Sequence, residues 1–120
     1  MTKILIVDDD EVVRFTLKRA LSFDTMLITL TESAQKAISE LERVSFDLLI
    51  LDLVLPVMNG IELLKTLKSN HSHAKIPVII CTAFATPELE EKVLGIGADF
   101  LLAKPFEIEG MINVVQKTLS

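Results

Sequence analysis

The sequence has little of what secreted and membrane proteins depend on. Its 120 residues include a single cysteine, Cys81, which cannot form a disulfide within the chain. It has no run of about 20 apolar residues, the length that a bilayer-spanning helix needs. The apolar segment Ile4–Val7 is too short for the core of a signal peptide, and three aspartates follow it at once. We therefore expect a cytoplasmic protein with no membrane segment.

Positive charge is also scarce. There are 12 basic against 17 acidic residues, a formal net charge of −5. Nucleic acids and anionic membrane surfaces select for Lys and Arg, so this balance argues against both as direct partners. An apolar content of 50% with 24% charged residues excludes a disordered segment. The length fits a single domain, and we expect residues 1–120 to form one.

Two hydrophobic periodicities alternate along the chain. Strand-length apolar runs occur at Ile4–Val7, Met26–Leu30, Leu48–Leu51, Pro77–Cys81 and Phe100–Leu102, and amphipathic stretches of helical length at Glu11–Ser22, Ser33–Arg43, Gly60–Ser69, Pro87–Leu94 and Phe106–Leu119. Five strands that alternate with five helices predict an α/β fold, a doubly wound parallel sheet with helices on both faces. The first and third runs are apolar at every position, which is typical of central strands. The second is interrupted by Thr29, which favours an edge strand.

The ends and faces of two helices can also be predicted. In Glu11–Ser22, the apolar face holds Leu17, Ala20 and Leu21, and we expect the basic residues Arg14, Lys18 and Arg19 to face solvent. Thr86 followed by Pro87 is a favourable helix start, and Gly95 and Gly97 are expected to end that helix.

Polar residues follow four of the predicted strands. Asp8, Asp9 and Asp10 follow the first, Asp52 the third, Thr82 the fourth and Lys104 the fifth. The carboxyl ends of parallel strands share one edge of the sheet, where open α/β sheets bind their ligands. Topology alone therefore gathers these carboxylates, a hydroxyl and an ammonium group at one edge.

Each of these residues has an ordinary structural explanation when taken alone. An aspartate between a strand and a helix is usually an N-cap, but one cap accounts for only one of Asp8, Asp9 and Asp10. Thr82 and Lys104 would individually pass for a strand residue and a surface charge. Asp52 closes an aliphatic run, so we expect it to be partly buried and to need a compensating partner.

Together, the carboxylates predict a cation site. Two carboxylates about 4 Å apart repel by roughly 4 kcal/mol at an effective dielectric constant of 20, so a cluster takes up protons or binds a cation. Oxygen ligands favour Mg²⁺, with Mn²⁺ as an alternative, whereas Zn²⁺ prefers His or Cys. A weaker metal candidate is the pair His71 and His73, which we expect in a surface loop. A carboxylate beside Mg²⁺ can attack phosphorus, and a nearby Lys and Thr can stabilise the transferred group.

In order and spacing, several motifs resemble the receiver domain of bacterial two-component response regulators of the chemotaxis-regulator type. They are Ile4-Leu5-Ile6-Val7-Asp8-Asp9, Asp52-Leu53-Val54-Leu55-Pro56 with Asn59-Gly60, Thr82-Ala83, Gly97-Ala98-Asp99 and Lys104-Pro105-Phe106. The resemblance covers essentially the whole chain and implies a flavodoxin-like sheet with strand order 2-1-3-4-5. In that order the first and third strands are neighbours, which brings Asp8 and Asp9 beside Asp52.

The resemblance also implies roles for individual residues. Asp52 would be the phosphoacceptor, and Mg²⁺ would be held by Asp8, Asp9, Asp52 and the backbone carbonyl of Val54. The phosphoryl group would be bound by Lys104, Thr82 and the backbone N–H of Ala83. The donor would be a phosphohistidine on a sensor histidine kinase or phosphotransfer protein. Such a domain is no conventional enzyme, although it assists its own phosphorylation and dephosphorylation.

A switch is implied as well. Phosphorylation would move Thr82 and alter partner binding on the surface of Pro87–Leu94, Phe100–Leu102 and Phe106–Leu119, either as a monomer or through a phosphorylation-dependent dimer. Leu101 stands where the family usually has Tyr or Phe, so no aromatic side chain can report phosphorylation there. Pro105 is expected to follow a cis bond. Val54 and Phe84, at positions that vary the approach of hydrolytic water in the family, are both apolar, and this predicts slow self-dephosphorylation.

Other function classes remain as alternatives. A haloacid-dehalogenase-like phosphatase also uses an aspartate after a strand, but it usually has a second aspartate two residues on, where this chain has Val54. A flavin-binding module on the same architecture would not place three aspartates in its phosphate loop. The last alternative is a degenerate, phosphorylation-independent interaction domain. No output domain is expected within these residues.

Overall fold

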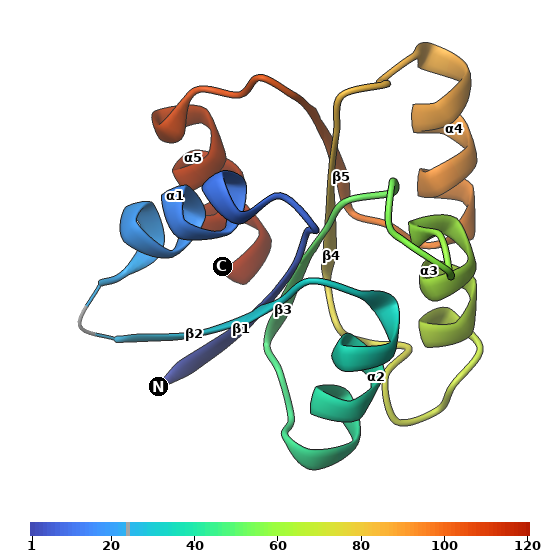
Figure 1. The fold of residues 1–120 in the computed structure, drawn as a ribbon, viewed down its shortest axis with the longest axis horizontal. Coiled ribbons are helices and arrows are strands. Elements are labelled where there is room, and N and C mark those ends of the chain that lie inside the picture. The colour runs from blue at the N-terminus through green and yellow to red at the C-terminus, as the bar shows by residue number, and fades with distance from the viewer. Residues whose placement is uncertain (24) are drawn as a thin grey trace.

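The chain folds into a five-stranded parallel sheet between two layers of helices (Figure 1). The computed structural model describes residues 1–23 and 25–120. The strands are β1 (Thr2–Val7), β2 (Met26–Thr31), β3 (Leu48–Leu51), β4 (Val78–Thr82) and β5 (Phe100–Ala103); the helices are α1 (Glu11–Leu21), α2 (Ala34–Arg43), α3 (Gly60–Lys68), α4 (Pro87–Ile96) and α5 (Ile108–Leu119). The strand order is β2-β1-β3-β4-β5, which confirms the predicted fold and places β2 at an edge.

Strand alternation divides the core into two clusters. One face of the sheet, with Leu5, Leu49 and Ile80 among its residues, packs against α2, α3 and α4. The other face, which includes Ile4, Ile50 and Cys81, packs against α1 and α5. Figure 1 shows the two helical layers on opposite sides of the sheet. Every residue of β1 from position 4 onward, and every residue of β3, is buried, as expected for central strands covered on both faces.

Two predicted helix ends need correction. α4 continues through Gly95 to Ile96, and its C-cap residue is Gly97, whose φ of 131° lies in the region that favours glycine. α5 begins at Ile108, two residues after the predicted start at Phe106, because Glu107 still has an extended backbone and serves as the N-cap residue. The predicted start of α4 is confirmed, since the Thr86 hydroxyl accepts the N–H of Leu89 at 3.1 Å.

The strand register determines where the functional edge lies. The Asp52 N–H donates to the Val7 carbonyl at 2.9 Å, and the Asp8 N–H donates to the Thr31 carbonyl at 3.1 Å. β1, β2 and β3 therefore end side by side, and the residues that follow them share one edge. Within the described residues, no helix is both long enough and apolar enough to cross a membrane.

Candidate functional site

Three aspartates from two neighbouring strands gather at this edge. Asp8, Asp9 and Asp52 each offer a carboxylate oxygen, and these oxygens lie within 4.8 Å of one another. Asp8 and Asp52 are buried, with exposed fractions of 2% and 6%, whereas Asp9 is exposed. The topology therefore brings together the residues that the sequence predicted to meet.

Asp10 has the structural role expected of one aspartate in this run. Its side chain accepts the N–H groups of Val12 at 2.9 Å and Val13 at 3.4 Å, and so caps the start of α1. This N-cap satisfies backbone donors that the first helical turn would otherwise leave unpaired. Asp8 and Asp9 remain for the cluster.

Asp8 accepts hydrogen bonds at both carboxylate oxygens and at its backbone carbonyl. Its Oδ1 accepts the Asp10 N–H at 2.9 Å, and its Oδ2 accepts the Lys104 ammonium at 2.7 Å. Its backbone carbonyl accepts Nη1 of Arg14 at 2.9 Å. Because both the carboxylate and the backbone are anchored, the loop that follows β1 has a defined conformation at the cluster.

Lys104 joins the two buried carboxylates. Its Nζ donates to Asp8 and, at 3.1 Å, to Oδ2 of Asp52, while Oδ1 of Asp52 accepts the Val54 N–H at 3.1 Å. The Lys104 side chain is 16% exposed. Its backbone N–H donates to the Thr82 carbonyl at 2.8 Å, and the Lys104–Pro105 peptide bond is cis, as the resemblance implied.

Burial and neighbouring charges shift the pKa values of Asp8 and Lys104. Burial is the main cause that raises the pKa of Asp8; the Lys104 bond opposes it and the charge of Asp52 adds to it. Burial alone would lower the pKa of Lys104, but its bonds to Asp8 and Asp52 outweigh burial, and its pKa is raised. Three carboxylates with one ammonium group leave an excess of negative charge when all are ionised.

The ligand set fits a hard divalent cation. Its donors are all carboxylate oxygens, which suit Mg²⁺ or Mn²⁺ better than Zn²⁺. Among residues 1–23 and 25–120, this is the one group of three or more His, Cys, Asp and Glu side chains whose ligand atoms lie so close together. Cys81 is buried in β4, where burial raises its thiol pKa to about 12, so it is not a candidate ligand.

The other predicted site residues surround the aspartates. Thr82 is fully buried at the end of β4, and its hydroxyl accepts the Phe84 N–H at 3.3 Å. Ala83 is exposed beside it. Val54 and Phe84 are apolar and have exposed fractions of 51% and 67%. Both side chains are therefore open to water.

Leu101 and Pro105 line two different hollows. Leu101 is half-buried and packs against the core cluster shared by α2, α3 and α4. Together with Thr86 and Pro87 it lines a hollow of about 290 Å³ beside the start of α4. Pro105 lines a different groove, on the side of α1.

Two residues shape the site in ways that the sequence did not predict. Arg14 was predicted to face solvent with Lys18 and Arg19, but it is only half-exposed and donates to the Asp8 carbonyl. Its place one turn after the Asp10 cap was the available signal. Gly60 donates its N–H to the Leu53 carbonyl at 2.8 Å, and a Cβ built on it would lie 2.5 Å from the Asp52 carbonyl oxygen.

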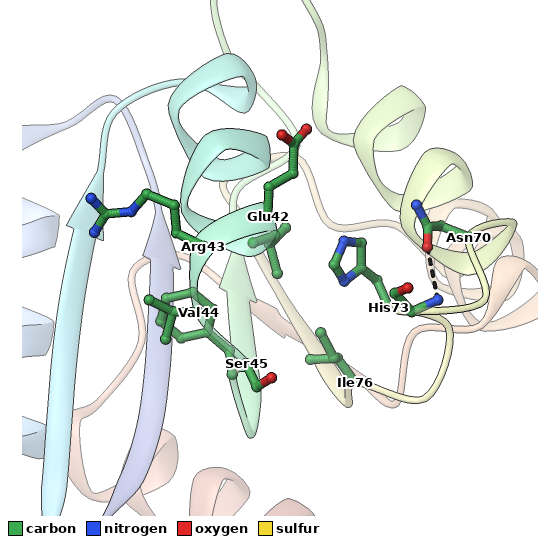
Figure 2. Close-up of a pocket in the computed structure, with 10 residues that line it drawn as sticks. Glu42, Arg43, Val44, Ser45, Asn70, His73 and Ile76 are labelled. Carbon is green, nitrogen blue, oxygen red and sulfur yellow. Dashed lines mark hydrogen bonds between the residues drawn. The ribbon is translucent and has the colours of Figure 1, made fainter.

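A second hollow lies at the opposite edge of the sheet, far from the aspartates in the fold. It measures about 590 Å³ and is lined by residues from the end of α2, the segment before β3 and the loop before β4. Figure 2 shows Glu42, Asn70 and His73 around it. His71 and His73 belong to this loop region, but they form no three-residue metal group among the described residues. The predicted histidine pair thus lies away from the candidate site.

Comparisons with known proteins agree with the geometry. The sequence model described as "Response regulator receiver domain" matches residues 4–116. The chain is 34% identical to Response regulator MprA of Mycobacterium leprae over 119 residues, which cover 98% of this chain and 50% of that protein. It is 32% identical over 117 residues to the DNA-binding transcriptional regulator NtrC of Salmonella typhimurium, covering 98% of this chain and 24% of NtrC. It therefore spans half or less of the length of these curated relatives.

Solved structures show the same fold. The chemotaxis protein CheY4 of Vibrio cholerae superposes with a TM-score of 0.92 at 27% identity, covering 99% of both chains. The non-phosphorylated HemR receiver domain of Leptospira biflexa gives a TM-score of 0.91 at 28% identity, covering 100% of this chain and 95% of that one. The chain therefore belongs to the response regulator receiver domains, the phosphoacceptor domains of bacterial two-component systems, which are phosphorylated on an aspartate.

Proposed function

We propose that residues 1–120 form one receiver domain in which Asp52 accepts a phosphoryl group in a Mg²⁺-dependent reaction. The observation that carries this proposal is the shared environment of Asp52. Its buried carboxylate lies within 4.8 Å of Asp8 and Asp9 and is bonded to Lys104. This arrangement supports a site in which Asp52 is the nucleophile, the three carboxylates hold a cation and Lys104 supplies an ammonium group.

Asp8, Asp9 and Asp52 would hold the cation, with the backbone carbonyl of Val54 as a further ligand. Mg²⁺ keeps several waters and takes few protein carboxylates, so a cluster with one exposed member, Asp9, suits it. When bound, Mg²⁺ would offset charge on the phosphoryl oxygens. It would also compensate the negative excess that Lys104 alone leaves in the site.

The transfer itself needs little besides positioning and charge. An oxygen of the Asp52 carboxylate attacks the phosphorus of a phosphohistidine. A P–O bond forms as the P–N bond breaks, and the leaving imidazole takes the electron pair and a proton from water. Lys104, which is bonded to Asp52, would donate to the oxygens of the transferred phosphoryl group. The Thr82 hydroxyl and the Ala83 N–H would bind the remaining oxygens. In this sense the domain assists its own phosphorylation and dephosphorylation.

The donor is a sensor histidine kinase or a phosphotransfer protein, and an apolar groove beside the site suits its docking. The groove measures about 480 Å³ and runs between the start of α1 and the segment before α5. Lys104 and Ala83 line it together with Val12 and Ile108, whose exposed fractions are 72% and 47%. It is therefore continuous with the phosphoacceptor site.

A charge placed in this groove separates docking from chemistry. Ile108→Glu should lower phosphotransfer from a kinase by about tenfold, a loss typical of one disrupted apolar anchor. Phosphorylation by a small acyl phosphate, which needs no docking surface, should be unchanged. Equal phosphotransfer by the variant and the wild type would contradict this placement of the donor.

The output of the domain would be a change on the surface of α4, β5 and α5. Thr82 is bonded to the backbone of Phe84 in the loop that leads to α4, so a shift of Thr82 toward a phosphoryl group would move that loop. The hollow between Leu101 and the start of α4 gives the loop room to repack. Partner binding or dimerisation on this surface, in the cytoplasm, would carry the signal.

Intact-mass spectrometry tests the proposal directly. The wild type, incubated with Mg²⁺ and a small acyl phosphate, should gain the mass of one phosphoryl group. Asp52→Asn should gain none, and removal of Mg²⁺ by a chelator should abolish the gain in the wild type. Equal phosphorylation of the two proteins would sink the assignment of Asp52.

A further inference from the structure

Arg14 differs from the other basic residues of α1. Lys18 and Arg19 are exposed, whereas Arg14 is half-buried and turns back toward the end of β1. Its Nη1 donates to the Asp8 carbonyl at 2.9 Å across six residues of sequence. The Arg14 backbone is itself fixed, because its N–H donates to the Asp10 carbonyl at 3.0 Å in the first turn of the helix. The guanidinium thus links α1 to the loop that carries Asp8 and Asp9.

This bond lies next to the least restrained member of the acidic cluster. The Asp8–Asp9 peptide is held at its carbonyl by Arg14, and the Asp9–Asp10 peptide is held at its N–H by Oδ1 of Asp8 at 2.9 Å. Asp9 is exposed, and among the described residues its carboxylate accepts no recorded hydrogen bond. The two anchored peptides on either side of Asp9 hold its backbone, and with it the direction of its Cα–Cβ bond.

We propose that Arg14 is a positioning residue for the cation site. By holding the Asp8 carbonyl, it keeps the Asp9 carboxylate directed at Asp8 and Asp52. This inference rests on the proposed Mg²⁺ site, in which Arg14 would not contact the cation but would orient one of its ligands. Groups that orient metal ligands typically change metal affinity by about 10- to 100-fold when removed.

The positive charge of Arg14 should weaken cation binding, whereas its positioning of Asp9 should strengthen it. A guanidinium beside a cluster of carboxylates repels an incoming cation. Its field also reaches Glu32, the residue after β2, where it adds to the stronger effect of the Lys36 bond in lowering the Glu32 pKa. If charge alone mattered, removing the guanidinium would tighten Mg²⁺ binding. If positioning dominates, removing it weakens Mg²⁺ binding.

The test compares Arg14→Met with Arg19→Met in the 120-residue chain. Both variants lose one positive charge from α1, and only the first loses the bond to the Asp8 carbonyl. Isothermal titration with Mg²⁺ should give a dissociation constant about tenfold higher for Arg14→Met. Arg19→Met should bind Mg²⁺ as the wild type does or slightly more tightly. Equal or tighter binding by Arg14→Met would overturn the proposal.

Two further readouts separate positioning from general damage. With an acyl phosphate donor, Arg14→Met should need more Mg²⁺ for half-maximal phosphorylation yet reach nearly the wild-type rate at saturating Mg²⁺. Amide hydrogen exchange at Asp10, whose N–H donates to Oδ1 of Asp8, should accelerate in this variant without a comparable change in β3 or β4. If the wild type binds no Mg²⁺, the proposed cation site fails. Exchange then decides the role of Arg14, because unchanged exchange at Asp10 would refute it.

Discussion

Gly60 lies against the backbone of the residue that we propose is phosphorylated. A Cβ at this position would meet the Asp52 carbonyl oxygen and the Cα of Leu53, each at 2.5 Å. Both are backbone atoms of the segment that leaves β3, so they cannot turn away as a flexible side chain could. Gly60→Ala should therefore displace either the start of α3 or the Asp52 segment.

The size of the effect follows from these contacts. Overpacking a well-packed site costs about 1–3 kcal/mol, and a clash with backbone belongs at the upper end of that range. Alanine regains up to about 1 kcal/mol of helix propensity over glycine. We expect a net loss of about 2 kcal/mol, which for a domain of this size lowers Tm by about 8 °C.

Gly95→Ala is the matched control. Gly95 lies within α4, and nothing is found within 4 Å of the position that its Cβ would take. The same chemical change should there stabilise the protein by about 0.5–1 kcal/mol. Thermal unfolding followed by circular dichroism would measure both shifts, and Mg²⁺-dependent phosphorylation should fall in Gly60→Ala alone. Shifts of the same sign in the two variants would refute the close-approach argument.

Three further predictions concern the charged site and its surroundings. Because burial raises the Asp8 pKa, the folded state holds this proton to a higher pH than the unfolded chain does, so the charged form costs stability. Without Mg²⁺, Asp8→Asn should therefore raise Tm by a few degrees at neutral pH. This gain in Tm should vanish as the pH falls through the raised pKa to below 3.8. In saturating Mg²⁺ the wild type should have the higher Tm, since only the wild type gains binding energy. Lys104→Met leaves two buried carboxylates without their ammonium partner, so the free energy of unfolding without Mg²⁺ should fall by about 3 kcal/mol. Phosphorylation by an acyl phosphate should slow about 100-fold, and an unchanged rate would exclude Lys104 from the transfer. Phe84→Gln, at an exposed position, should leave stability within about 0.5 kcal/mol while shortening the lifetime of the phosphorylated protein by roughly tenfold, measured by the decay of its intact mass.

The sheet could be predicted from sequence because its central strands are continuous apolar runs, whereas the helices alternate apolar and polar positions. Ile4–Val7 and Leu48–Leu51 are short and apolar at every position, a pattern typical of strands buried on both faces. The polar residues that follow them then meet at one edge through topology, with no need to know any side-chain conformation. This is why the proximity of Asp8, Asp9 and Asp52 was predictable.

Contacts that depend on a rotamer or on a backbone angle were not predictable in the same way. Periodicity places Arg14 on the polar side of α1, but whether its long side chain extends into solvent or reaches back to the Asp8 carbonyl is decided by tertiary structure. The end of α4 depends on which of two glycines adopts a positive φ, and the sequence offers Gly95 and Gly97 equally. The start of α5 depends on the extended backbone of Glu107, which no residue pattern marks.

Locating the phosphoryl group tests the central claim most directly. The wild type would be phosphorylated with an acyl phosphate in Mg²⁺ and treated with borohydride, which reduces an acyl phosphate to an alcohol. Peptide mass spectrometry would then find the modified position. We predict reduction at Asp52 alone, and none when Mg²⁺ is chelated beforehand. Reduction at Asp8 or Asp9 instead, or reduction of Asp52 at the same rate without Mg²⁺, would contradict the proposed site.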